Sequence, residues 1–482
     1  MLEAKSHQTL KELQKTITPT WQHNLTLSRL VGRSLRRKDH TIIQIDLCSQ
    51  NSWWLGLLIP LCIDSSDTML VLNAEQRKYL FETELPKLNK NGYKLYTWEK
   101  EIPPPGKELW IANEFIFLNA YKNNFLLSKQ IIVPDIERFN MNLCEALSIR
   151  IDAKDWTSLL KNNEINKDLI LEFYNTMTKS LFRQSSGKDC IVKINSNEIS
   201  SIRRICNSKN ITSKKWNDFF SIDNSKWTNW AELKHANLSW RWLIKPVEPF
   251  QVLEKLFNNN PFIFIVQSDL KETLISKKLE TISCEINSEV TLISHKDKKE
   301  IAVFAPKYQP LPNSKIYMKH LFYQAKRLII SMHGISILII DDPTMLLQVT
   351  SLLASEFGTR VTLENINQKS NSVICCSSLW WLSNYQELSN PKQLIIGLLP
   401  FASLAEPLTA ARVENLKRLK KDWFRELLLP EAMNIFAHLV FPLRNTDTRL
   451  AILDGRLRSR RWGNDFLDIL EPWKAIHSLL PP

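Results

Sequence analysis

The chain has 482 residues, of which 44% are hydrophobic and 23% are charged, a balance that predicts a large buried core and excludes wholesale disorder. Its net charge of +13 favours a polyanionic partner, and we expect nucleic acid before membrane because no basic amphipathic anchor accompanies the charge. The sequence shows neither a secretory leader nor a long uncharged apolar run, so the cytoplasm is the expected location.

The N-terminal stretch 5–40 carries apolar residues at helical spacing, which predicts a helix. Arg29, Arg33, Arg36 and Arg37 fall on about one face of this helix. Such a face can contact phosphates, and it can equally be a solvated helix surface. Both interpretations remain open at this stage.

Short apolar runs then alternate with amphipathic stretches such as 75–88. This rhythm predicts mainly parallel sheets covered by helices on both faces. The predicted strands are 41–47, 68–74, 109–113, 130–136, 262–268, 300–305, 335–341, 360–363, 371–376, 393–401 and 449–454.

Residues 140–245 are polar and rich in Lys, Asn and Ser, and we expect a helical insertion with one strand at 190–194. Aromatic rings interleaved with cations can stack bases and neutralise phosphates on single-stranded nucleic acid. The same rings can instead be core anchors of a small subdomain. The nucleic-acid candidates here are Lys214, Lys215, Trp216, Lys226, Trp227 and Arg241.

The eight cysteines form no CxxC pair and no zinc or iron–sulfur spacing. Adjacent Cys375 and Cys376 lie in an apolar run, and we expect them to be reduced, structural thiols on a buried strand. No metal site is expected.

The last third of the chain carries three ordered blocks: a strand ending in LPF within 393–412, the stretch LLLPEAM at 427–433, and RNTDTRLAILDGRL followed by WGNDFLDILEP within 444–472. In order and spacing these blocks resemble the C-terminal domain of DinG-type (XPD-like) superfamily 2 DNA helicases. The rest of the chain is similar more loosely, with 112–120 and 130–139 resembling the strand pair that carries the family's acidic box.

The resemblance implies an α/β fold of two tandem RecA-like domains, 1–311 and 312–482, with the helical insertion in the first. It places residues 50–54 over the family's GTGKT phosphate loop. Tryptophan then stands in place of the lysine and of the magnesium-binding hydroxyl, so an indole would fill the phosphate volume. The remnant positions are Gln50, Ser52, Trp53 and Trp54.

Three other motifs depart from the family pattern. The acidic box falls on Asp135 and Glu137, which are not adjacent and follow a proline. The family's motif V keeps only Trp380, a further nucleic-acid candidate, and its motif VI keeps only Arg444, which could still stabilise a phosphate. The Gly187–Lys188 pair lacks the GxxxxGK spacing of a phosphate loop, and only ten glycines occur in the chain.

We therefore expect a helicase homologue that binds single-stranded or forked DNA, with ATPase motifs lost, in DNA repair or replication. One alternative is an active, divergent ATP-dependent DNA helicase, which would require ATP and Mg²⁺. Another is a protein-interaction scaffold without a nucleic-acid role. We expect no cofactor and no iron–sulfur cluster, since 63–143 contains no cysteine. A repair or replication protein is a possible partner and a membrane is not; the sequence carries no signal for an oligomeric state.

Overall fold

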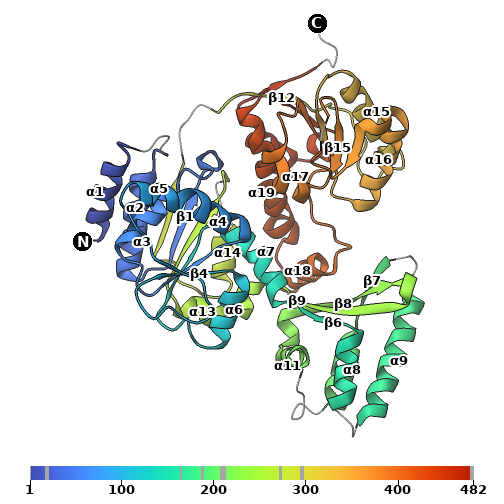
Figure 1. Ribbon diagram of the computed structural model, residues 1–482. Helices are drawn as coiled ribbons and strands as arrows, with labels where there is room; N and C mark the ends of the chain where they lie inside the picture. The colour runs from blue at the N-terminus through green and yellow to red at the C-terminus, as the bar shows by residue number, and fades with distance from the viewer. Residues whose placement is uncertain are drawn as a thin grey trace.

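The computed structural model describes residues 2–16, 21–162, 166–185, 189–206, 213–270, 274–293, 298–367 and 369–477. These residues form two seven-stranded parallel sheets and one four-stranded antiparallel sheet (Figure 1). The predicted α/β architecture of two tandem parallel-sheet domains is confirmed. Gly187 and Lys188 lie outside the described residues.

The first sheet has the strand order β11-β1-β10-β5-β2-β4-β3, and all its pairs are parallel. Its strands β1, β2, β4 and β5 are buried along their whole length, as expected where helices cover both faces of a parallel sheet. The strands are β1 (Thr41–Ile45), β2 (Thr68–Val71), β3 (Thr97–Trp98), β4 (Leu109–Ala112), β5 (Gln130–Val133), β10 (Phe262–Gln267) and β11 (Ser288–Leu292).

Two groups of helices cover this sheet, each with its own hydrophobic cluster. The first group comprises α1 (Leu2–Leu13), α2 (Asn24–Arg37), α3 (Trp54–Ile63) and the continuous helical run α4 (Ala74–Tyr79), η2 (Leu80–Glu84) and α5 (Leu85–Lys90). The second group comprises α6 (Glu114–Lys122), α7 (Ile136–Leu147), α12 (Pro249–Val252), α13 (Glu254–Asn259) and α14 (Leu274–Glu280).

The described part of the insertion contains helices and the predicted strand near 190–194, but also three strands that were not predicted, so it is a mixed α/β subdomain. Its antiparallel sheet has the order β6-β9-β8-β7, and β8 and β9 form a hairpin that pairs Trp227–Lys234 with Ser239–Pro246. Tryptophans on the hairpin pack on the sheet face that helices cover, which favours strands over helices. The elements are β6 (Ile149–Ile151), α8 (Ala153–Asn162), α9 (Lys167–Gln184), β7 (Asp189–Lys193), α10 (Ser196–Ile205), α11 (Lys214–Ser221), β8 (Trp227–Lys234) and β9 (Ser239–Pro246).

The second sheet has the order β14-β15-β13-β16-β17-β12-β18 and is also parallel throughout. Because β12 belongs to this sheet and β11 to the first, the domains divide between these two strands, ahead of the predicted division after residue 311. The strands are β12 (Ile301–Phe304), β13 (Ser336–Ile339), β14 (Val361–Leu363), β15 (Val373–Cys376), β16 (Gln393–Ile396), β17 (Arg449–Ile452) and β18 (Trp473–Ala475).

Helices again cover both faces of the second sheet. The pair α15 (Tyr317–Ile330) and α16 (Pro343–Phe357) packs on one side. The other side is covered by α17 (Ser378–Asn384), α19 (Leu429–Val440), α20 (Arg456–Ser459) and α21 (Gly463–Ile469), while α18 (Pro407–Arg418) lies toward the insertion (Figure 1).

Two further sequence predictions need correction. The N-terminal helix predicted over 5–40 is two helices, α1 and α2. The stretch 112–120, expected as part of a strand pair, is mostly helix α6, because Asn113 accepts hydrogen bonds from the amides of Phe115 and Ile116 and so starts a helix directly after β4. The short edge strands β3 and β18 were not predicted.

The segment Phe424–Asn445 is long and apolar enough to cross a membrane by length and composition alone. Half of its most apolar window is buried inside the protein, against the second sheet. This burial is typical of a core helix, so the segment is weak support for a membrane span.

Candidate nucleotide cleft and nucleic-acid interface

The carboxyl ends of β5 and β10 face helix α19 of the second domain. The side-chain amide of Asn434 on α19 donates to the Glu137 carboxylate at 2.5 Å, and its oxygen accepts from the Ser268 hydroxyl at 3.2 Å. Because open parallel sheets bind ligands outside the carboxyl ends of their strands, this seam is the candidate cleft.

The loop between β1 and α3 occupies the place of a phosphate loop. The amide of Ser49 donates to the Asp46 carboxylate at 2.6 Å, and the amide of Gln50 donates to the Leu47 carbonyl at 3.2 Å. The amide of Ser52 donates to the Ser49 carbonyl at 2.8 Å. A phosphate site needs main-chain N–H groups aimed at the anion. These three amides are used within the loop instead.

Trp53 and Trp54 are core residues. Their side chains are 0% and 1% exposed and stack on each other with ring centroids 4.9 Å apart. Both belong to the hydrophobic cluster between α1–α3 and the first sheet. The expectation that an indole fills a phosphate volume is therefore corrected: burial of the two large apolar rings has drawn them into the core below the loop.

The other two remnant positions lie at the surface of the same loop. Gln50 is exposed and has a left-handed φ of 43°. Ser52 is half-buried, and its hydroxyl donates to the Ser49 carbonyl at 2.5 Å. That hydroxyl is thus engaged within the loop, where a magnesium-binding hydroxyl would need to face the metal.

The two carboxylates predicted as remnants of an acidic box serve different structural roles. Asp135 precedes α7 and accepts a hydrogen bond from the Arg138 amide at 3.0 Å, so it caps that helix. Glu137 instead contacts Asn434 of the second domain. Burial, reinforced by the charge of Asp135, raises the pKa of Glu137 to about 7.

Glu137 should therefore make stability depend on pH. The folded protein binds its proton more tightly than the unfolded chain, so this stabilisation is complete below about pH 4.5 and is lost as pH rises through about 7. We expect Glu137→Gln, which keeps an acceptor for Asn434, to raise the free energy of unfolding at pH 8 by about 1–3 kcal/mol and to change it little at pH 5.

Urea unfolding at pH 5, 6, 7 and 8 measures this effect. Glu82→Gln, at an exposed position of η2, is the matched control and should show no pH-dependent difference. The charges that act on Glu137 besides Asp135 are Glu431, which also raises its pKa, and Lys278, which lowers it. Equal unfolding free energies for Glu137→Gln and the parent at pH 8 would contradict the prediction.

Arg444 is not directed at the loop after β1. Its guanidinium donates to four main-chain carbonyls at 2.8–3.3 Å, those of Lys299, Ile469, Glu471 and Pro472. These carbonyls precede β12 and β18, so Arg444 joins the amino ends of two strands of the second sheet. The structure assigns it a packing role that its sequence position did not predict.

Comparisons with known proteins agree with this architecture. No family model matches the chain. Over 132 residues, 27% of the chain, it is 33% identical to the ATP-dependent DNA helicase YoaA of Escherichia coli (strain K12). An XPD helicase structure superposes with a TM-score of 0.63 and 10% identity over 95% of this chain and 100% of that one. The S. tokodaii Xpd4 structure gives a TM-score of 0.62 and 13% identity at the same coverage.

The resemblance to DinG/XPD-like helicases is confirmed. The two parallel-sheet domains are accordingly RecA-like. The chain spans 20% of the length of the YoaA protein in the matched region, so that protein's activity does not transfer with the match.

In this XPD-like fold the arginine face of α2 lies on the outside of the first domain. Arg29, Arg33, Arg36 and Arg37 are all exposed. Arg36 is paired with Glu3 of α1 at 2.6 Å, so part of this face holds the N-terminal helix. The face remains a candidate surface, but it lies far from the insertion in Figure 1.

The candidates in the insertion divide between core and surface. Trp216 is fully buried and its indole N–H donates to the Asp155 carbonyl at 2.9 Å, so it is a core anchor. Lys215 pairs with the Asp155 carboxylate at 2.6 Å. The ammonium of Lys226 donates to the Gln251 carbonyl at 3.0 Å.

The remaining candidates lie on different elements. Trp227 is partly buried against the insertion core, whereas Lys214 and Arg241 are exposed. Trp380 belongs to α17 of the second domain and is half-buried. The predicted residues thus do not form one surface.

A surface that the sequence analysis missed lies on the second domain. Phe401, Phe424 and Trp462 have ring centroids 5.0–5.8 Å apart, and Trp423 extends this cluster at 6.2 Å from Phe424. Lys417 lies over the Trp423 ring at 5.3 Å. We give the name cation–aromatic surface to these rings together with the exposed cations of the chain segments that carry Trp423 and Trp462, namely Lys417, Arg418, Lys420, Lys421, Arg425, Arg460 and Arg461.

Two dense runs of basic residues could have revealed this surface. They are LKRLKKDWFR at 416–425 and RLRSRRW at 456–462. Each run contains a tryptophan beside several cations, but only folding brings the two runs together. Within the described residues, no three His, Cys, Asp or Glu side chains gather as a metal site.

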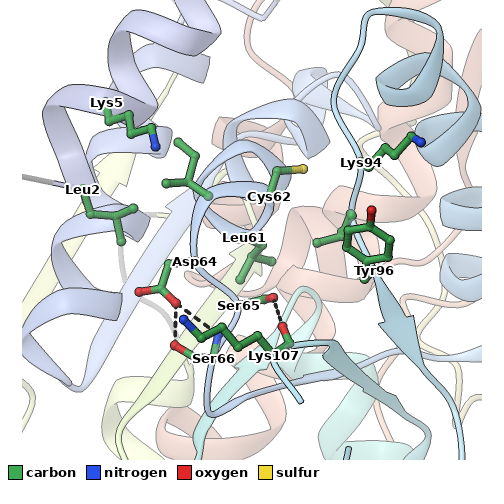
Figure 2. Close-up of a pocket in the computed structure, with 12 residues that line it drawn as sticks. Leu2, Lys5, Leu61, Cys62, Asp64, Ser65, Ser66, Lys94, Tyr96 and Lys107 are labelled. Atoms are coloured by element: carbon green, nitrogen blue, oxygen red, sulfur yellow. Dashed lines mark hydrogen bonds between the residues drawn. The ribbon is translucent and has the colours of Figure 1, made fainter.

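The pocket in Figure 2 lies elsewhere, at the carboxyl end of α3 beside α1. It has a volume of about 600 Å³, and its lining includes Lys5, Cys62 and Lys107. The Asp64 carboxylate in its wall accepts hydrogen bonds from the Ser66 amide at 3.1 Å and hydroxyl at 2.5 Å. The loop after β1 is at the opposite end of α3, so this pocket is separate from the candidate cleft.

Burial raises the pKa of several thiols, including that of Cys375 to about 11. None of the described cysteines whose side chains are placed forms a disulfide, and Cys375 and Cys376 are buried on β15 as predicted. The thiols whose pKa burial raises, those of Cys375 and Cys376 among them, are therefore protonated and unreactive near neutral pH.

Proposed function

We propose that this chain is a DinG/XPD-like helicase homologue that binds single-stranded or forked DNA without hydrolysing ATP. The observation that carries the proposal is the loop after β1, whose amides bond within the loop and whose lysine position is a core tryptophan. We place the chain in the cytoplasm, beside proteins of DNA repair or replication.

The absence of ATP hydrolysis follows from the chemistry that the reaction requires. Phosphoryl transfer relies on a lysine and glycine-backed amides at the phosphates and on carboxylates at magnesium and water. Here Asp135 caps helix α7, and Glu137 contacts Asn434 of the other domain. The two carboxylates do not form an adjacent acidic pair, because Ile136 separates them in the sequence.

Nucleic-acid binding is supported by charge and by the cation–aromatic surface. The net charge of +13 supplies the general attraction for phosphates. Aromatic rings with neighbouring cations stack bases without regard to sequence and are typical of single-strand binding surfaces. Half-buried Trp423 and Trp462 provide such rings.

An active, divergent ATP-dependent DNA helicase is the second candidate, because the curated relative YoaA bears that name. This candidate requires nucleotide binding by a loop that lacks the usual groups. ATP turnover stimulated by DNA would establish it.

The test is anisotropy of a labelled DNA fork titrated at several salt concentrations. We expect binding that weakens steeply with salt, and a salt slope reduced by about 1 for each of Lys420→Ala and Lys421→Ala. Trp423→Ala should weaken binding by about 5- to 150-fold, the equivalent of one lost base stack. No ATP turnover should accompany binding in the same samples.

Trp98→Ala is the matched control, because Lys100 lies over the Trp98 ring at 4.8 Å in the first domain, as Lys417 does over Trp423. It should leave DNA affinity unchanged. Binding that is absent, or that ignores salt, would transfer support to a protein-interaction scaffold.

A further inference from the structure

A buried ion bridge joins the two domains beside the insertion. Arg412 of α18 lies between two carboxylates: its Nε is 2.8 Å from Glu248, and its other guanidinium nitrogens are 2.7 and 3.2 Å from Glu431. Glu431 belongs to the second domain, whereas Glu248 immediately precedes α12 of the first. The three side chains are only 15–21% exposed.

The ionised state of Glu248 in this bridge depends on the neighbouring cations. The Glu248 carboxylate is desolvated, yet Arg412 and then Lys278 hold its pKa below the usual value. Lys278 of the first domain is 3.9 Å from the same carboxylate. Separating the domains would remove Arg412 from Glu248, and a buried charge that loses its partner is strongly unfavourable.

A second bridge lies one turn further along α19. Asn434 contacts both Glu137 after β5 and Ser268 after β10. His438 continues the same face of the helix, because residues at i, i+3 and i+7 align, and it lies beside Gln267 at the end of β10. This face therefore covers the strand ends of the first domain with protein groups.

We propose that these two bridges hold the two domains together without nucleotide. The chain therefore keeps one closed arrangement, which we call the clamp, whether or not a ligand is present. Side chains of α18 and α19 make the contacts between the domains directly. Figure 1 shows α7, α18 and α19 meeting at the junction of the two domains and the insertion. The inference concerns conformation and does not depend on DNA binding.

Small-angle X-ray scattering of the full chain, with and without Mg²⁺ and ATP, tests the clamp. We expect scattering that matches the closed arrangement in both conditions. The double variant Glu248→Ala/Asn434→Ala removes both bridges yet leaves Arg412 paired with Glu431 inside the second domain. It should shift the radius of gyration and the maximum dimension to larger values.

The control is Glu426→Ala/Asn464→Ala, which removes one acid and one amide from exposed positions of the second domain and should scatter like the parent. If the double variant unfolds, Ser268→Ala is the milder variant, and hydrogen exchange over 268–270 and 429–440 should become faster in it. A parent chain that is extended without nucleotide, or variants identical to the parent by both methods, would overturn the inference. A closed chain that fails to bind DNA would count only against the proposed function.

Discussion

Replacement of Trp53 with lysine is expected to unfold the first domain rather than to restore a phosphate loop. The Trp53 ring is 0% exposed and stacks on Trp54 within the core cluster. Removing a buried tryptophan costs about 3–5 kcal/mol, and placing an ammonium group in the same apolar site adds to that cost. We therefore expect Trp53→Lys to lower the free energy of unfolding by more than about 4 kcal/mol.

Circular dichroism during urea unfolding measures this loss. Gln50→Lys is the control, because it adds the same charge to the same loop at an exposed position. Its effect should stay within about 0.5 kcal/mol, as surface substitutions usually do. A folded Trp53→Lys protein that binds ATP would show that the indole is dispensable to the core and that the loop can still accept phosphates.

Arg444→Met is expected to destabilise the second domain by about 3–5 kcal/mol, because hydrogen bonds from a charged donor are strong and the loss leaves half-buried carbonyls without this partner. The four carbonyls flank the starts of β12 and β18. The loss should appear in urea unfolding and as faster hydrogen exchange over 299–304 and 469–476.

Arg461→Met is the control that distinguishes a loss of stability from a loss of DNA binding. Arg461 is exposed on the cation–aromatic surface, so its loss should weaken DNA binding with little effect on stability. Arg444→Met should show the reverse pattern after correction for the unfolded fraction. An Arg444→Met protein of parental stability would return this residue to the role of a phosphate-stabilising group.

Most strands could be predicted because a strand of a doubly covered parallel sheet is itself a short continuous apolar run. β1, β10, β13 and β17 all coincide with such runs. The hairpin strands of the insertion were missed because they are not continuous apolar runs. Its hairpin strands β8 and β9 mix tryptophans with cations, and their two-residue alternation is too irregular to separate from helix without knowledge of the pairing.

The candidate site divides in the same way. The residue types at 50–54, with tryptophan at two of the five positions, can be read directly from the chain. The location of their side chains in the folded protein cannot be predicted in this way. Burial of two indoles under the loop depends on α1, α2 and α3 packing on the sheet, a set of contacts that no local pattern encodes.

The sequence by itself thus determined the positions of most strands of the two parallel sheets and the likeness of the last third to DinG/XPD-like helicases. Only the tertiary structure decided that Arg444 binds carbonyls and that Arg412 and Asn434 bridge the domains. The physical reason is range. Hydrophobic periodicity is written within one element, whereas the bond between Glu137 and Asn434 joins residues 297 positions apart, which only the packing of two domains brings together.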